Sequence, residues 1–171
     1  MSPTHMLEQA RQLAFAAHAE QRYGVHPYTD HLEDVAALLE PYGEQAQTLG
    51  YLHDIVEDTD VDLATIRAQF GPFIADCVAL LTDEDGPSRA ERKARTHAKM
   101  AQARGEVTLS LIVKAADRLA NVDACIADGR KDKLERYIAE HPAFRAAAYR
   151  PGLCDDLWAQ LDRAIASGEK P

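Results

Sequence analysis

The chain has 171 residues, of which 46% are hydrophobic and 27% are charged, and its formal net charge is −9. This length and composition are typical of one soluble globular domain covering residues 1–171. The negative charge argues against a general surface for nucleic acid or for anionic membranes, because both attract positively charged proteins. An anionic ligand would therefore need a cation or a local basic patch at its site.

The cysteines and the N-terminal residues bear on the cellular compartment. Cys77, Cys125 and Cys154 are far apart and form no CxxC pair, which is typical of free thiols in a reducing compartment. The N-terminal residues include Glu8 and Arg11 and contain no long apolar run, so neither a signal peptide nor a membrane-spanning helix is expected. We expect a cytoplasmic protein without a membrane partner, and the sequence leaves its oligomeric state open.

Helical periods dominate the chain, and strand-like alternation is hard to find. Helices are predicted at about 4–22, 30–40, 44–57, 62–69, 71–82, 88–104, 107–127, 131–148 and 152–167. Asp62 is a candidate N-cap, and Ser88 with Glu91 resembles a capping box. Many helices with short connections predict an all-α globule of about eight to nine helices, with the helices of 131–167 packing on the rest.

The predicted helix 44–57 places polar side chains on one face. At about 100° per residue, His53, Asp54, Glu57 and Asp58 lie together opposite an apolar side. Carboxylates one turn apart repel each other, and a divalent cation would turn that repulsion into ligation. A solvated acidic face is the alternative. The pairing of His53 with Asp54 favours a metal site, because imidazole and carboxylate are transition-metal ligands.

The predicted helix 107–127 is apolar around most of its circumference, which indicates burial nearly all round. Lys114, Asp117 and Asn121 nevertheless project from one side of it. A carboxylate in a dry interior needs a cation or a close partner. Asp117 is therefore interpreted as a metal ligand, with an ion pair to Lys114 or Arg118 as the alternative.

His31 lies at the start of the predicted helix 30–40, where a lone histidine is usually a capping or surface residue. His31 becomes a candidate metal ligand only in combination with other residues. His31, His53, Asp54 and Asp117 offer two imidazoles and two carboxylates from three helices. Such a set could hold one manganese, iron, cobalt or zinc ion and leave a position open for water.

An open coordination position suits a hydrolase, because the ion acidifies its bound water and offsets charge on a phosphoryl oxygen. Glu57 and Asp58 follow the predicted ligands by one helical turn. We predict that they are catalytic and orient or deprotonate the water. Their closeness to each other and to other carboxylates should raise the pKa of at least one of them.

Two sequence motifs carry a resemblance to a known family. They are Leu52-His53-Asp54-Ile55-Val56-Glu57-Asp58-Thr59 and, later in the chain, Lys114-Ala115-Ala116-Asp117-Arg118-Leu119-Ala120-Asn121. With Pro27-Tyr28 and His31, they resemble the HD superfamily of metal-dependent phosphohydrolases over roughly residues 8–150. The similarity is greatest to the hydrolase domain of the RelA/SpoT homologues, and within it to the small stand-alone alarmone hydrolases.

The resemblance implies an HD-domain fold, a manganese ion on the four predicted ligands, and a water served by Glu57 and Asp58. It implies that the substrate is a nucleotide, ppGpp or pppGpp, which loses its 3′-pyrophosphate to give GDP or GTP. Asn121 would contact the nucleotide sugar. Arg22 would correspond, loosely, to an Arg-Lys pair that grips nucleotide or phosphate in the family.

Two departures from the family pattern leave the substrate open. The loop from Arg22 to Tyr28 is shorter than the family's and lacks its lysine, and Asp123 stands where a positive charge is common. The alternatives are an adenosine alarmone such as (p)ppApp, a nucleoside monophosphate, or the 2′-phosphate of NADPH. A further alternative is a nucleotide-sensing module without catalysis.

A basic stretch lies between the two motifs, at Arg89, Arg92, Lys93, Arg95 and Lys99. It could steer an anionic substrate toward an otherwise acidic protein, and Lys93, followed by Arg92, is the predicted phosphate contact. The alternative is a solvated charged helix.

Overall fold

The computed structural model describes residues 3–168, which are almost entirely helical. The first half holds α1 (Pro3–Ala17), α2 (Tyr28–Leu39), α3 (Glu44–Leu52), α4 (Ile55–Asp58), α5 (Leu63–Phe70) and α6 (Pro72–Leu81). The second half holds α7 (Arg89–Ala101), α8 (Leu109–Ala127), α9 (Lys131–Ala148) and α10 (Asp155–Gly168). Short 3-10 helices, η1 (Glu40–Tyr42) and η2 (Gly105–Thr108), precede α3 and α8. The predicted all-α fold is confirmed.

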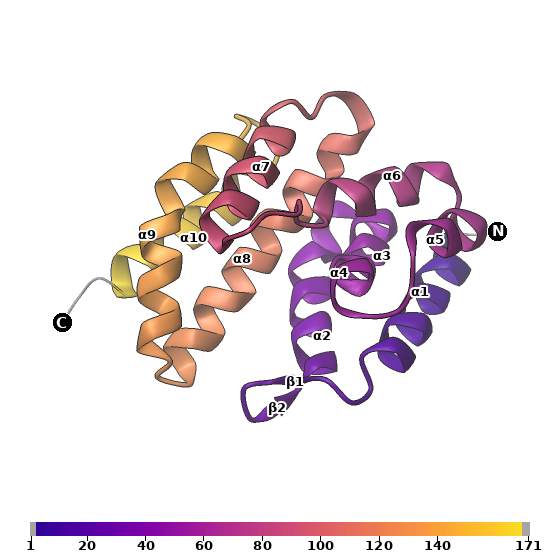
Figure 1. Cartoon of the computed structure of the whole chain (residues 1–171), viewed down its shortest axis with the longest axis horizontal. Coiled ribbons are helices and arrows are strands. Elements are labelled where there is room, and N and C mark those ends of the chain that lie inside the picture. The colour runs from indigo at the N-terminus through magenta and orange to yellow at the C-terminus, as the bar shows by residue number, and fades with distance from the viewer. Residues whose placement is uncertain (1–2, 169–171) are drawn as a thin grey trace.

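Helix α8 runs through the middle of the molecule (Figure 1). It packs against α2, α3 and α6 on one side and against α9 and α10 on the other. Its predicted burial nearly all round is confirmed, with Leu111, Val113 and Ala116 wholly inaccessible to solvent. Full burial of a leucine or valine side chain stabilises a fold by about 1.5–3 kcal/mol relative to exposure. Among the helices of residues 3–168, none combines the length and hydrophobicity needed to cross a bilayer.

Helices α2 and α3 approach each other closely at Gly50. A β-carbon built there would lie 2.8 Å from Leu39 Cδ1 and 3.5 Å from Ala36 Cα. Glycine, which has no side chain, permits this approach. Because His31 lies on α2 and His53 directly follows α3, the contact sets their ring centroids 5.4 Å apart.

The predicted helix 44–57 is not continuous. Helix α3 ends at Leu52, α4 begins at Ile55, and Asp54 between them has φ −109° and ψ 0°. The expectation of one continuous helical face through His53 and Glu57 was therefore wrong. The break still leaves both α4 carboxylates beside Asp54, because the backbone N–H groups of Glu57 and Asp58 donate to its carbonyl at 3.1 and 2.9 Å.

The predicted helix 4–22 is also shorter than expected. It ends at Ala17, and a two-residue hairpin follows, with β1 (Arg22–Tyr23) antiparallel to β2 (His26–Pro27). Gly24 turns the hairpin with φ +64°, a conformation that glycine adopts without strain. This hairpin was missed because strands of two residues contain no alternation to detect.

The predicted helix caps are present. The Asp62 side chain accepts a hydrogen bond from the Thr65 N–H at 2.8 Å, and Ser88 Oγ accepts from the Glu91 N–H at 3.2 Å. The capping box is incomplete, because the Glu91 carboxylate accepts from the Ser88 hydroxyl at 2.9 Å. Ser88 thus begins α7, the helix that carries the basic stretch to the site.

Candidate functional site

The four predicted metal ligands converge. His31, His53, Asp54 and Asp117 each offer one ligand atom, and these atoms lie within 4.8 Å of one another. His31 Nε2 is 3.2 Å from Asp117 Oδ1, while His53 Nε2 is 3.0 Å from Asp54 Oδ2 and 3.5 Å from Asp117 Oδ1. Both imidazoles are buried and both carboxylates are partly exposed, so the group faces solvent through its carboxylates.

The hydrogen bonding of His53 fits a metal ligand. Its Nδ1 lies 2.7 Å from the carbonyl oxygen of Gly50, which can only accept, so Nδ1 carries the hydrogen. Its Nε2 is buried and makes no hydrogen bond with the described residues, although two carboxylates face it. In the neutral ring this Nε2 presents a lone pair to negative charge. Such an arrangement calls for a cation, and backbone orientation of the opposite nitrogen is typical of metal-binding histidines.

The electrostatics of the cluster agree with this reading. Burial alone would lower the pKa of His53, but the Asp54 and Asp117 carboxylates outweigh it and raise that pKa well above its ordinary value. Burial would raise the pKa of Asp54 and of Asp117, but His53 holds the pKa of Asp54 down, and both histidines hold the pKa of Asp117 down. The site therefore favours positive charge between its carboxylates. A divalent cation would satisfy the same demand and displace the proton.

Tyr28, at the start of α2, supports Asp54 from outside the cluster. Its hydroxyl donates to Asp54 Oδ2, and its ring stacks on His18 with centroids 4.8 Å apart. Burial, followed by the Asp54 charge, raises the pKa of Tyr28 far above its ordinary value, so the hydroxyl stays protonated and able to donate. Such bonds around a ligand orient it and tune its basicity.

Asn121 lies one turn after Asp117 and lines the same pocket. Its Nδ2 donates to Asp117 Oδ1 at 2.6 Å and to the Asp117 carbonyl at 3.0 Å. Its Oδ1 accepts from the hydroxyls of Tyr23 at 2.6 Å and Tyr137 at 3.0 Å. The amide is thus fully occupied by protein partners. A contact between Asn121 and a nucleotide sugar stays a prediction and would have to replace one of these bonds.

Glu57 and Asp58 lie exposed on the pocket wall. The Asp83 N–H donates to Glu57 Oε2 at 3.1 Å, and Gln21 Nε2 donates to Asp58 Oδ2 at 3.0 Å. Displacement of water by surrounding protein raises the pKa of Glu57; the bond from Asp83 opposes this rise, and the Asp83 charge adds to it. The predicted rise is found for Glu57, but burial contributes more than the neighbouring carboxylates.

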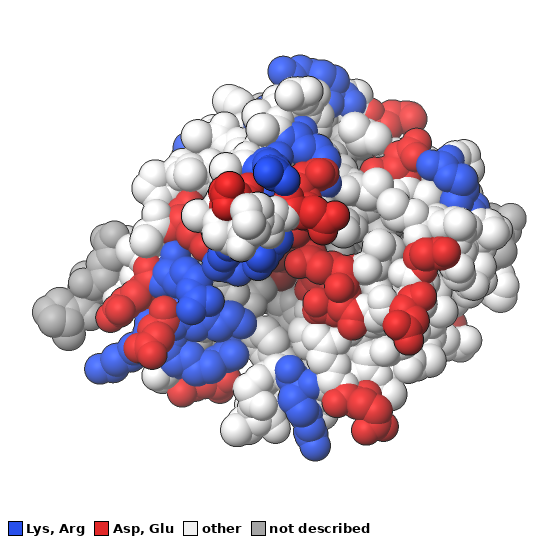
Figure 2. Space-filling model, viewed as in Figure 1, with Lys and Arg blue, Asp and Glu red and all other residues white. Residues whose placement is uncertain are grey.

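The cluster opens into a cavity of about 300 Å³ with walls of opposite charge. Its acidic wall consists of Asp54, Glu57, Asp58, Asp83 and Asp117, and its basic wall of Arg22, Arg89, Lys93, Lys114, Arg118 and Lys133. Tyr23, Tyr28, Asn121 and Tyr137 complete the lining. Figure 2 shows acidic atoms gathered on the α4 side of the hollow and basic atoms on the α9 side.

The basic stretch of α7 divides between two faces. Arg89 and Lys93, one turn apart, line the cavity, and Lys93 Nζ lies 2.6 Å from Asp83 Oδ2. Arg95 and Lys99 lie on another face and bind carbonyl oxygens of the α6–α7 region, among them the Asp85 and Thr82 carbonyls. Arg92 does not line the cavity. The helical period therefore assigns two members of the stretch to the site.

Three lining residues were missed from sequence: Tyr23, Lys133 and Tyr137. Lys133 and Tyr137 are one turn apart on α9, a helix whose sequence shows no motif. The spacing of a cation and an aromatic on one helical face was the available signal, but only packing of α9 against α8 shows where that face points. Asp123, the departure noted above, is exposed and does not line the cavity.

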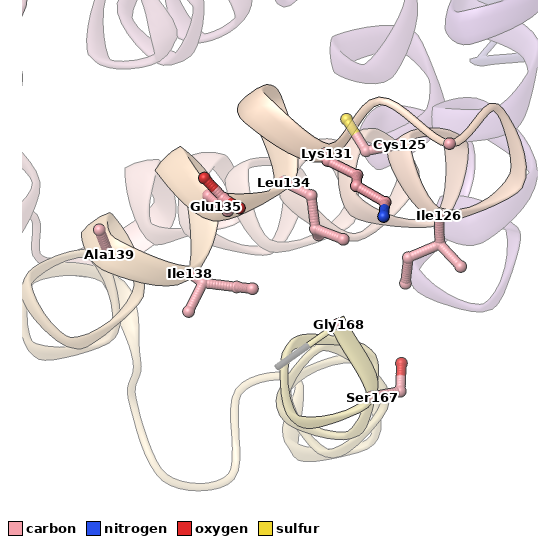
Figure 3. Close-up of a pocket in the computed structure, with 10 residues that line it drawn as sticks. Cys125, Ile126, Lys131, Leu134, Glu135, Ile138, Ala139, Ser167 and Gly168 are labelled. Carbon is pink, nitrogen blue, oxygen red and sulfur yellow. The ribbon is translucent and has the colours of Figure 1, made fainter. Parts of the chain in front are cut away.

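A larger cavity of about 630 Å³ lies elsewhere, between the end of α8, α9 and α10. Figure 3 shows Ile126, Leu134 and Ile138 among its lining side chains, with Lys131 and Glu135 as its charged residues. It contains no histidine or aspartate among its described lining residues and shares none with the charged cavity. The metal-ligand chemistry therefore belongs to the smaller, charged cavity.

Residues 10–141 match the family model of the HD domain. This chain belongs to the HD-domain family. A relative from Danio rerio, the guanosine-3′,5′-bis(diphosphate) 3′-pyrophosphohydrolase MESH1, is 31% identical over 131 residues, covering 71% of this chain and 69% of MESH1. A probable enzyme of the same name from Synechocystis is 32% identical over 165 residues, covering 92% of this chain.

The chain spans only 21% of the length of the Synechocystis relative. Among solved structures, a metazoan ortholog of SpoT described as hydrolysing ppGpp superposes with a TM-score of 0.76. The superposition covers 99% of this chain and 98% of that one at 21% identity, and it shows the shared fold. The resemblance inferred from the sequence motifs is confirmed at the level of the family.

Proposed function

We propose that this HD-domain protein is a divalent-metal-dependent hydrolase that removes the 3′-pyrophosphate from ppGpp or pppGpp, giving GDP or GTP and pyrophosphate. One observation carries the proposal: Asp54 and Asp117, the two carboxylates of the metal-ligand cluster, line the same cavity as a wall of six cations. The names of the relatives support the choice of substrate. Manganese is the proposed ion and the cytoplasm the proposed location.

The two walls suit two parts of one substrate. A pyrophosphate group carries several negative charges, and Arg89, Lys93 and Lys133 would hold them through charge-assisted hydrogen bonds. Their presence explains how a chain with net charge −9 could bind an anion. The acidic wall would repel the same phosphates unless a cation lay between them. Substrate and metal binding are therefore expected to support each other.

The bound cation would supply Lewis acidity toward a phosphoryl oxygen and would acidify water. Glu57 would accept the proton that the attacking water loses, and its raised pKa makes it a stronger base than an ordinary glutamate. Asp58, held by Gln21, would orient the water. A bond forms between the water oxygen and phosphorus, the bond from phosphorus to the 3′ oxygen breaks, and solvent protonates that oxygen.

The test is a substrate comparison with purified protein and Mn²⁺. ppGpp, an adenosine tetraphosphate alarmone, a nucleoside monophosphate and NADPH would be assayed side by side, with released pyrophosphate and phosphate measured separately. We expect pyrophosphate from ppGpp, and none from the Asp54→Ala variant. Asp76→Ala is the matched control, because Asp76 is an exposed carboxylate paired with Arg67 outside the cavity.

Each outcome decides between the alternatives. Preferred turnover of the adenosine alarmone, the monophosphate or NADPH would replace the proposed substrate with that compound. Tight ppGpp binding without turnover would identify a nucleotide-sensing module instead. Full activity of Asp54→Ala would contradict the metal site itself.

A further inference from the structure

Tyr23 lies between the predicted metal ligands and the start of α9. Its ring stacks on the His31 ring with centroids 4.8 Å apart and planes at 13°. The Arg130 guanidinium carbon lies 4.5 Å and Lys133 Nζ 4.6 Å from the centroid of the same ring. Cation–π contacts of this length are attractive and strengthen when partly shielded from water. Tyr23 thus connects a metal ligand on α2 with the cations that begin α9.

The Tyr23 hydroxyl reaches a second predicted ligand through one intermediate. It donates to Asn121 Oδ1 at 2.6 Å, and Asn121 Nδ2 donates to Asp117 Oδ1 at 2.6 Å. A half-turn of the Asn121 amide would set its oxygen against the Asp117 carboxylate, which can only accept, so this carboxylate fixes which end of the amide faces it. The Tyr23 hydroxyl then anchors the opposite end of the amide by donating to its oxygen.

We propose that Tyr23 is a positioning residue for the metal centre: its ring holds the His31 imidazole, and its hydroxyl, acting through Asn121, holds the Asp117 carboxylate. This inference rests on the proposed metal-dependent function. Here an aromatic residue stands in the loop and supports the ligands, while Lys133 from α9 brings positive charge to the cavity.

The geometry separates the two contributions of Tyr23. Tyr23→Phe keeps the ring over His31 and removes the hydroxyl, whereas Tyr23→Leu removes both. Substitutions of residues that orient metal ligands typically weaken metal binding or activity about 10- to 100-fold. We expect metal binding about 10-fold weaker in Tyr23→Phe and about 100-fold weaker in Tyr23→Leu.

The measurement is titration of Co²⁺ into metal-free protein, followed by the visible absorption of the bound ion, which reports affinity and ligand geometry without any substrate. Tyr42→Phe is the matched control, because Tyr42 is a partly buried tyrosine in η1 that does not line the cavity. Circular dichroism of the metal-free proteins checks the fold. If Tyr23→Leu does not fold, Tyr23→Phe still decides the role of the hydroxyl, and Tyr23→Met, which keeps a long apolar side chain without the aromatic ring, decides the role of the ring.

A double-mutant cycle tests the route through Asn121. If the hydroxyl acts through Asn121, Tyr23→Phe should reduce Co²⁺ affinity very little in an Asn121→Ala background. The losses of Co²⁺ affinity in the two single variants will then not add in the double variant. Additive losses would show that the hydroxyl acts by another route and would contradict this part of the inference. A change in general stability alone would not move the Co²⁺ spectrum.

The inference and the proposed function fail in different ways. Wild-type Co²⁺ affinity and spectrum in both Tyr23 variants would overturn the positioning role, whatever the substrate. Loss of Co²⁺ affinity in the variants, together with no ppGpp hydrolysis by the wild type, would overturn the function and leave the positioning role standing. A wild-type protein that binds neither Co²⁺ nor Mn²⁺ would overturn both.

Discussion

The two walls of the charged cavity are built in different ways. The acidic wall comes mainly from the segment around His53-Asp54 and from Asp117 on the central helix, and Asp54 and Asp117 lie together with the two histidines. The basic wall draws one side chain each from β1 and α9 and two each from α7 and α8. The comparison teaches that a metal centre can be specified by short motifs, whereas an anion site can be collected from whichever helices pack around it.

The walls also differ in how their charge is compensated. Three cations of the basic wall have carboxylate partners: Lys93 pairs with Asp83, and Arg89 and Arg118 both pair with Glu140. The carboxylates of the metal cluster form no ion pair with a described Lys or Arg; they face the two histidines and accept hydrogen bonds from neutral donors, so a bound metal ion would meet no competing side-chain cation there. We therefore expect large losses from changes in the acidic wall and graded losses from changes in the basic wall.

The largest effect is expected from Glu57→Gln in the acidic wall. Removing the proposed proton acceptor should lower kcat by about 100-fold or more while Co²⁺ binding stays near that of the wild type. Because burial raises the pKa of Glu57, the acid limb of the wild-type rate profile should lie above the ordinary pKa of glutamate. Steady-state kinetics across pH checks both, with Glu135→Gln, an exposed residue outside the cavity, as the control.

A graded effect is expected from Lys133→Ala in the basic wall. Losing one phosphate contact should raise KM about 10-fold, equivalent to about 1.4 kcal/mol, with kcat changed little. The matched control is Lys131→Ala, two residues earlier on α9, which lines the larger apolar cavity instead. Equal KM values for Lys133→Ala and the wild type would remove Lys133 from the substrate site.

The smallest effect is expected from Glu140→Gln, which weakens the ion pair that holds Arg89 of the basic wall. Burial would raise the pKa of Glu140, but the hydrogen bonds and charge of Arg89 outweigh it and lower that pKa. A lowered folded-state pKa stabilises the fold above the unfolded pKa, and this stabilisation disappears as pH falls through the folded value.

Because Arg89 is 39% exposed, water screens the pair, and we expect a loss of about 1 kcal/mol at pH 7. The unfolding free energies of wild type and Glu140→Gln in urea should converge as pH falls below the ordinary pKa of glutamate and through the lowered folded-state pKa of Glu140. A difference that persisted at acid pH would assign the effect to packing of α7 on α9 rather than to the charge.

The sequence by itself determined the class of fold and the identity of the clustered residues. Helical periods and caps such as Asp62 are local properties, so they could be found without knowing the neighbours. A carboxylate on a nearly all-apolar helix demands a partner wherever the helix packs, and this requirement brought Asp117 into the predicted site.

Only the tertiary structure decided how the site is held and which cations reach it. The break between His53 and Asp54 and the approach of α2 to α3 at Gly50 depend on contacts across helices, which no local pattern records. Lys133 and Tyr23 carry no motif, and their positions depend on how α9 packs against α8 and how the hairpin packs against α2. Charge and periodicity are properties of the chain, but the direction in which a side chain points is settled by the helices packed around it.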